Sequence, residues 1–175
     1  SDSQWPARMR VIVSDTSCVI DLHKAGLLEE FVCLRESIVF PEPLFDDETI
    51  SITKAEKNRL IKLGLEVRSL PGDQVGRAGQ YYNRYRQLKI HDCFALIVAE
   101  ETDKSVLLTG DKRLKAIAHQ HGVRSHGVLW ATDKIHDQQL CTLGKLRQAM
   151  RILLGDPFVY VPEHLIQTRI DQKYR

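Results

Sequence analysis

The sequence predicts a three-layer α/β fold, in which helices cover both faces of a central parallel sheet of four to five strands. Two observations carry this prediction: short apolar runs alternate with helical segments, and acidic residues follow several of those runs. From Val128 onward only helical patterns occur, which predicts a helical C-terminal extension. At 175 residues, the chain suits one domain with a proper core.

The predicted strands are short apolar runs. The clearest are 10–14, 37–40 and 105–109, which are rich in Val, Ile and Leu, as strands buried on both faces are. Shorter runs at 65–70 and 123–125 complete the set. Because helical segments separate the runs, we expect parallel strands with right-handed crossovers.

Helical segments follow the first two strands. The first helix is expected at 17–25 and is ended by Gly26. An apolar turn or two follows at 27–34. After the second strand a helix is expected from about Leu44, with the acids 46–48 in its first turn, where the helix dipole favours them.

Four further helices are expected in the sheet region. The segment 53–63 begins with Thr-x-x-Glu, the spacing of a capping box. The segment 73–88 is polar, whereas 92–102 is nearly all apolar and is expected to be buried against the sheet. The segment 112–121 is the last of these helices.

The chain divides into a short arm, an α/β domain and the extension. Residues 1–8 are polar and are expected to be a tag remnant or a disordered arm. Residues 9–127 are expected to form the α/β domain. Residues 128–175 are expected to pack on that same domain as helices over 128–135, 142–154 and 162–174.

Composition excludes several classes of protein. The 43% hydrophobic and 27% charged content is ordinary for a globular protein, and no apolar run reaches the roughly 18 residues that span a bilayer. The four cysteines form no CxxC pair, so we expect buried thiols in a reduced, cytoplasmic protein without a zinc site. The net charge of +2 predicts no strongly basic surface that would cover the protein and bind nucleic acid.

Acidic residues stand at four separated positions: Asp15, the run Asp46 to Glu48, Asp92 and Asp111. The carboxyl ends of parallel strands meet at one crevice, so these acids are expected to converge there. Gathered carboxylates repel one another unless a cation holds them. Oxygen ligands without nearby His or Cys suit Mg²⁺ or Mn²⁺, which predicts metal-assisted phosphoryl chemistry.

Each acid also has a purely structural interpretation. Asp15 can form an Asx turn at the end of its strand. Asp92 and Asp111 can each cap the helix that follows. The acids 46–48 can simply be favourable charges in a first helical turn. Only the ordered set of acids favours a metal pocket over these four local interpretations.

Four motifs in order resemble a PIN-domain nuclease. They are Ser14-Asp15-Thr16-Ser17 after the first strand, Phe40-Pro41 followed by the acid Asp47, His91-Asp92-Cys93-Phe94-Ala95-Leu96, and Leu107-Leu108-Thr109-Gly110-Asp111. Together the motifs cover roughly residues 10–126 of the chain. The segment that begins His126-Gly127-Val128-Leu129-Trp130 resembles a bacterial subgroup of stand-alone PIN proteins.

The resemblance implies a Mg²⁺- or Mn²⁺-dependent endoribonuclease, of a kind that often serves as the VapC-type toxin of a toxin–antitoxin pair. Its partners would be RNA, a small antitoxin protein and a second copy of the chain in a dimer. By resemblance Asp15, Asp92 and Asp111 hold the metal. Asp47 is the second acid in sequence order, with Glu48 as its competitor. Residues expected to position a phosphate or a ligand carboxylate are Thr16, Ser17 and Thr109.

Basic and aromatic residues are expected to hold the substrate. Cations along a rim would bind RNA phosphates, and tyrosines would stack on unpaired bases. The candidates for the rim are Arg84, Arg86, Lys89, Lys112 and Arg113, and those for stacking are Tyr81, Tyr82 and Tyr85. A solvated helix face is the alternative interpretation of Lys112, Arg113 and Lys115.

Two departures from the family pattern keep other functions open. Many PIN proteins carry an acid or Asn shortly after the last Asp, where this chain has Lys112, Arg113 and Lys115, and Asp47 is one methylene shorter than the usual Glu. A catalytically silent PIN-like module that binds RNA or protein is one alternative. A haloacid-dehalogenase-type phosphatase is another, although Ser17 stands where that class has its second Asp.

Overall fold

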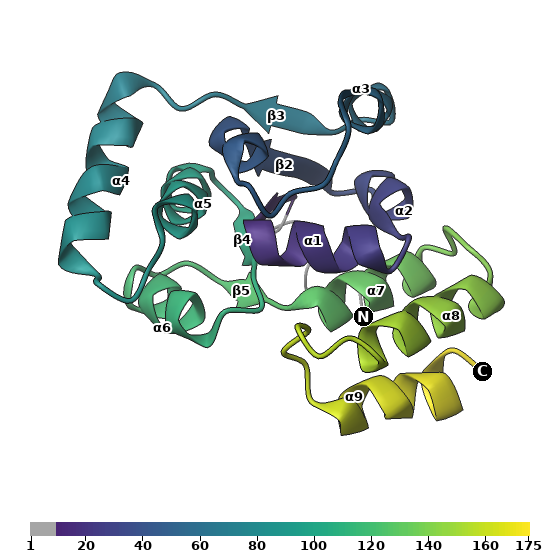
Figure 1. Ribbon diagram of the computed structural model, residues 1–175. Helices are drawn as coiled ribbons and strands as arrows, with labels where there is room; N and C mark the ends of the chain where they lie inside the picture. The colour runs from purple at the N-terminus through teal and green to yellow at the C-terminus, as the bar shows by residue number, and fades with distance from the viewer. Residues whose placement is uncertain (1–9) are drawn as a thin grey trace.

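The computed structural model describes residues 10–175, so the arm predicted at 1–8 lies outside the described residues. A parallel five-stranded sheet occupies the centre, in the order β3-β2-β1-β4-β5 (Figure 1). This confirms the predicted three-layer fold. The strands are β1 (Val11–Ser14), β2 (Ser37–Pro41), β3 (Glu66–Arg68), β4 (Ser105–Leu108) and β5 (Ser125–His126).

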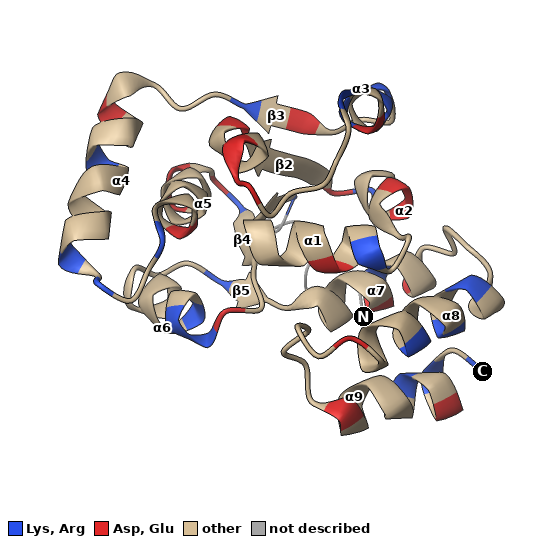
Figure 2. Cartoon of the chain, viewed as in Figure 1, with Lys and Arg blue, Asp and Glu red and all other residues tan. Residues whose placement is uncertain are grey.

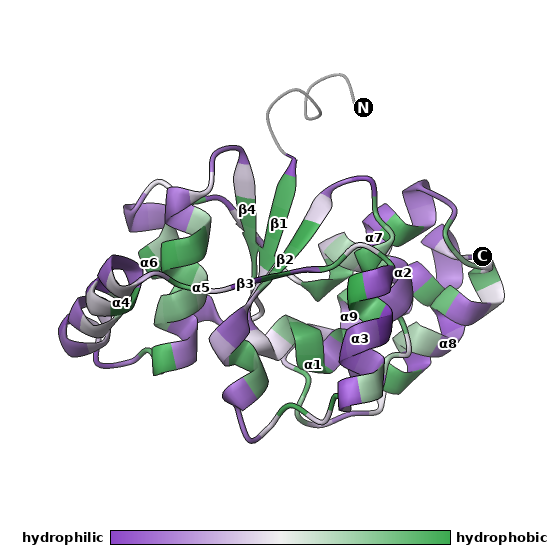
Figure 3. Cartoon of the chain, turned by 90° about the horizontal axis from the view of Figure 1, so that it is seen from above, coloured by the Kyte–Doolittle hydropathy of each residue, from purple (hydrophilic) through white to green (hydrophobic). Residues whose placement is uncertain are grey.

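Helices cover both faces of the sheet (Figures 1 and 3). One face carries α4 (Gly72–Arg84), α5 (Ile90–Glu101) and α6 (Lys112–Gln120). The other carries α1 (Thr16–Lys24), α2 (Leu28–Val32), α3 (Lys54–Lys62) and α7 (Val128–Asp137).

Alternation along the strands divides the core between these two faces. Val13 and Leu107 belong to the cluster under α5 and α6, whereas Ile12 and Leu108 belong to the cluster under α1 and α7. Successive side chains of a strand point to opposite faces, so a strand with helices on both sides is apolar throughout. This explains why the sequences of β1 and β4 are unbroken apolar runs.

The helix expected from Leu44 with acids in its first turn is wrong. The chain forms the 3₁₀ helix η2 (Glu42–Asp46), and Asp47 is already extended at φ −71° and ψ 127°. Pro41 and Pro43 have no amide N–H to donate, and the carboxylate of Asp47 accepts the backbone N–H of Thr49 at 2.9 Å. This local Asx contact competes with helical hydrogen bonding.

Two other boundaries differ from the sequence prediction. The helix expected over 73–88 ends at Arg84, because the backbone of Tyr85 leaves the helical region and the chain turns to bury Leu88. The last strand lies at Ser125–His126 rather than 123–125, since its residues pair with Leu107 and Leu108 of β4.

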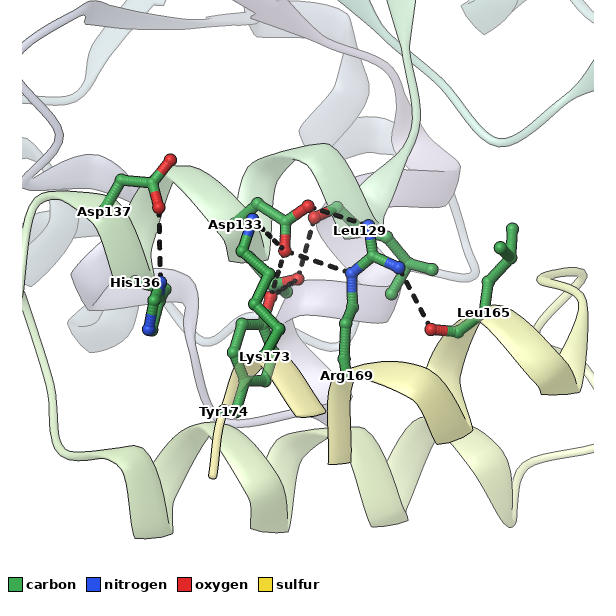
Figure 4. Close-up of polar contacts among 9 residues, drawn as sticks. Leu129, Asp133, His136, Asp137, Leu165, Arg169, Lys173 and Tyr174 are labelled. Carbon is green, nitrogen blue, oxygen red and sulfur yellow. Dashed lines mark hydrogen bonds and ion pairs between the residues drawn. The ribbon is translucent and has the colours of Figure 1, made fainter. Parts of the chain in front are cut away.

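The tail continues with α8 (Leu143–Leu154), α9 (Glu163–Thr168) and the π-helical turn η3 (Arg169–Lys173). Its apolar residues join the same hydrophobic cluster as α1 and α2. Figure 4 shows how polar contacts fasten the chain end to α7: Arg169 donates to both carboxylate oxygens of Asp133 at 3.0 and 2.7 Å, and the fully buried Tyr174 donates to Asp133 at 2.6 Å. Burial raises the pKa of Asp133, but Arg169 and Tyr174 outweigh it and lower the pKa.

The cysteines only partly match the expectation of buried thiols. Cys18 and Cys93 are buried, Cys141 is half-buried and Cys33 is exposed. Cys33 ends α2, where the chain returns to the surface, so the burial predicted for it is wrong. Within residues 10–175, no helix has the length and apolarity needed to cross a membrane.

Candidate active site

The candidate site lies where β1 and β4 end side by side. Ser14 of β1 pairs with Leu108 of β4, and the backbone N–H of Asp15 donates to the carbonyl of Leu108 at 2.9 Å. From here α1 leaves toward one face of the sheet and α6 toward the other (Figure 1). Strand order reverses at this point, and ligands of open α/β sheets bind at such a point.

Asp15 is the buried centre of the site, with only 1% of its surface exposed. One carboxylate oxygen accepts the backbone N–H of Cys18 at 2.9 Å, which makes Asp15 the N-cap of α1. The hydroxyl of Ser17 lies 2.9 Å from both oxygens. The hydroxyl of Thr109 donates to the second oxygen from the end of β4. The carboxylate thus caps α1 through the amide three residues on, whereas an Asx turn would use the amide two residues on.

Burial raises the pKa of Asp15 to about 7. The hydrogen bonds from Thr109, Cys18 and Ser17 act in the opposite direction, and the negative charge of Asp92 raises the pKa further. Near neutral pH the carboxyl group is thus divided between its charged and neutral forms. A cation beside it would favour the charged form.

Three hydroxyl residues predicted to position a ligand are gathered around Asp15. Thr109 is fully buried and also accepts the backbone N–H of Asp111 at 3.0 Å, while the amide of Gly110 lies 3.4 Å from the Ser17 hydroxyl. The buried hydroxyl oxygen of Thr16 has no hydrogen-bond partner among the described residues. Unpaired buried polar atoms are rare in proteins.

Asp92 and Asp111 extend the acidic cluster. Asp92 lies in the first turn of α5 rather than at its N-cap, and it accepts the backbone N–H of Lys89 at 2.9 Å. Burial raises its pKa and the nearby charge of Asp111 raises it further, against the effect of Lys89. Asp111 caps α6 by accepting the amides of Arg113 at 2.8 Å and Leu114 at 3.3 Å.

Mutual repulsion therefore links three of the four predicted acids. The charge of Asp92 acts on Asp15, and the charge of Asp111 acts on Asp92. Asp15 follows β1, Asp92 lies in the first turn of α5 and Asp111 follows β4, so all three stand at the carboxyl end of the sheet. Local hydrogen bonding and this shared position are both present: Asp15 and Asp111 cap α1 and α6, and Asp92 accepts the amide of Lys89 before α5.

Asp47 lies beside the start of α5 rather than in contact with the other acids. Its carboxylate is 3.5 Å from His91 and accepts hydrogen bonds from the amide and hydroxyl of Thr49 at 2.9 and 2.6 Å. Burial raises its pKa, but Thr49, His91 and Lys89 together lower it. Glu48, its competitor, is exposed.

The donor chemistry of the cluster fits a hard divalent cation. Asp92 and Asp111 each use one carboxylate oxygen in capping, and their second oxygens accept no hydrogen bond from residues 10–175. In the same range, as the side chains are placed, no three or more His, Cys, Asp or Glu residues form a group that could hold a metal ion. The match to Mg²⁺ or Mn²⁺ is therefore one of ligand type alone: carboxylate oxygens are the donors that these cations prefer.

The predicted rim of cations is exposed around this edge. Arg84 and Arg86 lie at the end of α4 and in the loop that follows, and Lys112 and Arg113 open α6. Figure 2 shows basic segments at the lower end of α4, along the connection to α5 and at α6. Lys89 precedes α5 and is exposed as well.

The tyrosines proposed for base stacking differ in accessibility. Tyr81 donates to Glu100 at 2.6 Å and Tyr85 lies 2.7 Å from a ring nitrogen of His121, so both hold α4 to its neighbours. Tyr82 is 47% exposed. Of the three, Tyr82 is the one that a base can reach without breaking a contact.

Sequence reasoning missed two features of the site. His91 precedes Asp92 in the chain and bridges to Asp47, a pairing that only the fold reveals. Lys115 lies near Thr109 and Gly127, although a solvated helix face was its alternative interpretation. The spacing was available in the sequence, because residues four apart share one face of a helix and Lys115 is four residues after Asp111.

The sheet order and the acids at its reversal point define an α/β fold of nuclease type. The family model of the PIN domain matches residues 11–173, and the chain belongs to this family. PIN domains are generally nucleases, and the match extends through the tail helices. No curated protein and no solved structure matches the chain significantly. Membership confirms the resemblance in the motifs and removes the phosphatase alternative.

Proposed function

We propose that the protein is a divalent-metal-dependent endoribonuclease that hydrolyses RNA phosphodiester bonds. The observation that carries the proposal is the placement of Asp15, Asp92 and Asp111 at the reversal point of a PIN-family sheet, where burial raises the pKa of Asp15 and of Asp92. Raised carboxyl pKa values in a crevice are typical of functional sites. Bringing three acids together costs stability, and a cation offsets that cost.

The residues would divide the work as follows. Asp15, Asp92 and Asp111 would hold Mg²⁺ or Mn²⁺, which when bound lowers the pKa of a water molecule so that a nucleophile is available near neutral pH. Ser17 and Thr109 keep the Asp15 carboxylate in one orientation through their hydrogen bonds.

Further residues would hold the substrate in place. By the family resemblance Thr16 would position a phosphate, and its buried hydroxyl has no hydrogen-bond partner among the described residues. The proposal includes Asp47 as a fourth acid that acts beside His91, with Glu48 as the competing assignment. The rim cations Arg84, Arg86, Lys112 and Arg113 would bind the RNA backbone by charge.

A cleavage assay tests this function. Mixed structured and unstructured RNAs are incubated with Mn²⁺, Mg²⁺ or chelator, with wild type, Asp92→Asn and the control Asp103→Asn. Asp103 is an exposed acid at the opposite end of β4. We expect metal-dependent cutting by wild type and the control, and none by Asp92→Asn. Cutting that persists in chelator would contradict the metal mechanism. Mn²⁺ binding by calorimetry without any cutting would favour a silent binding module.

The biological setting is a finer proposal that rests on the family. Toxin ribonucleases of the PIN family act in the cytoplasm, pair with a small antitoxin and form homodimers, and we propose the same setting here. The tail offers exposed apolar side chains for a partner, including Phe158 at 73% and Tyr160 at 83% exposure. A small DNA-binding protein encoded beside this chain would support the antitoxin pairing.

A further inference from the structure

A lysine on α6, the helix on the opposite face of the sheet from α1, lies beside the loop after β5. Lys115 follows the cap residue Asp111 by about one helical turn, so the two side chains share a helix face. A β-carbon placed on Gly127 would lie 3.5 Å from the Lys115 ammonium nitrogen and 3.7 Å from the Thr109 carbonyl oxygen. The ammonium group thus lies over the loop after β5, beside the residue that donates to Asp15.

Lys115 is half-buried and has no carboxylate within ion-pair distance among residues 10–175. Half-buried lysines normally have a partner, because desolvating an unpaired charge is costly. The charges of Asp15 and Lys115 act in opposite directions on the pKa of the buried Cys18 thiol. Unlike the exposed rim cations, Lys115 is half-buried and lies beside the loop after β5.

Positive charge converges on the same loop. Burial lowers the pKa of His126, and the charges of Lys115, Arg124 and Lys134 lower it further. The ring of His126 stacks on Trp130 with centroids 4.4 Å apart and planes 6° apart. The edge of the sheet thus carries an acidic cluster at β1 and β4 and a basic, aromatic cluster at β5 and α7.

We propose that Lys115 binds a phosphate of the single-stranded RNA that flanks the bond to be cleaved. The acids repel that phosphate, whereas the unpaired ammonium group of Lys115 next to Gly127 attracts it. The inference rests on the proposed nuclease function. It deepens that function by assigning a substrate-binding residue outside the acidic cluster.

A structural role for Lys115 is the competing explanation, in which the ammonium group only offsets the charge of the acids. The two roles differ in one measurable respect. A phosphate contact releases counterions from the nucleic acid, so its loss changes how binding depends on salt. Loss of a structural charge lowers stability and leaves that salt dependence unchanged.

The experiment measures binding separately from cleavage. A short fluorescent single-stranded RNA is titrated with Lys115→Met, Lys115→Arg, the control Lys62→Met and wild type, in chelator and at several salt concentrations. Lys62 ends α3 and is exposed at the far edge of the sheet. For Lys115→Met we expect about tenfold weaker binding, and a salt slope smaller by about 0.7, the value for one phosphate contact on a single strand. Lys115→Arg should restore both, and Lys62→Met should match wild type.

The outcomes separate this inference from the function on which it rests. Wild type that cuts RNA, together with an unchanged salt slope in Lys115→Met, overturns the inference alone. Wild type that neither binds nor cuts RNA overturns both. In cleavage kinetics we expect Lys115→Met to raise KM about tenfold while kcat stays within about twofold, because a contact made equally before and during the reaction affects binding only. Melting curves establish that each variant is folded.

Discussion

The charge of Asp15 should make the metal-free protein less stable as pH rises, and Asp15→Asn should remove this effect. Asp15 is almost completely buried, and burial raises its pKa from an ordinary value of 3.8 to about 7 in the folded protein. A raised carboxyl pKa means that the folded state binds the proton more tightly than the unfolded state. Stability is then highest below the unfolded pKa, falls as pH rises, and levels off above the folded pKa.

The magnitude follows from the shift. A carboxyl pKa raised from 3.8 to about 7 corresponds to a loss of about 4 kcal/mol of unfolding free energy at alkaline pH, of which about 2 to 3 kcal/mol is lost between about pH 5 and pH 8. Asparagine keeps an oxygen that can accept the Cys18 amide, and the hydroxyls of Ser17 and Thr109 can rotate to accept from its NH₂ group. The variant should therefore fold without the buried charge.

Urea unfolding in chelator measures the effect in wild type and Asp15→Asn across this pH range. Other groups titrate in both proteins, so the informative quantity is the difference in unfolding free energy between them. Relative to wild type, we expect the unfolding free energy of Asp15→Asn to rise by about 2 kcal/mol between about pH 5 and pH 8. Adding Mn²⁺ should stabilise wild type and leave the variant unchanged. A difference that stays constant with pH would refute the argument from burial.

Three further predictions concern the tail and the cysteines. Tyr174→Phe should lower the unfolding free energy by about 1 to 2 kcal/mol, because it removes the hydroxyl that donates to Asp133, and calorimetry measures the loss. Asp133→Asn should destabilise at neutral pH and approach wild type in acid, because a lowered carboxyl pKa contributes stability that is lost as pH falls through it; a penalty that persists in acid would contradict this. Cys33 should react with a thiol reagent in the native protein, whereas Cys18 and Cys93, buried and with raised pKa values, should react only on unfolding.

The elements of the sheet region could be predicted because their local signals agree with the fold. The apolar runs of β1, β2 and β4, and the buried helix α5, carry patterns that only a two-sided sheet satisfies. The helix predicted after β2 was wrong because two competing local signals were present in that segment. Acids favour a first helical turn, but Asp47 instead bonds to Thr49. Sequence spacing alone does not decide between these two uses of one carboxylate.

The candidate site could likewise be predicted only in part. Strand ends predict that Asp15 and Asp111 approach each other, because the sheet order places β1 beside β4. The contact of Asp47 with His91 and the approach of Lys115 to Gly127 join residues that are far apart in the chain. Such pairs depend on the relative placement of helices across the sheet edge. No periodicity in a single sequence encodes that placement.

The structural and functional interpretations of the acids are not alternatives. Asp15 and Asp111 cap α1 and α6, and Asp92 bonds to the amide that precedes α5. Capping fixes each carboxylate at the start of a helix, and the parallel sheet brings those starts to one edge. The backbone N–H groups that donate to these carboxylates stabilise their negative charge. Burial and the charge of a neighbouring acid act in the opposite direction and raise the pKa of Asp15 and Asp92. Capping therefore holds the carboxylates in place without neutralising them, and the remaining repulsion is what a bound cation would relieve.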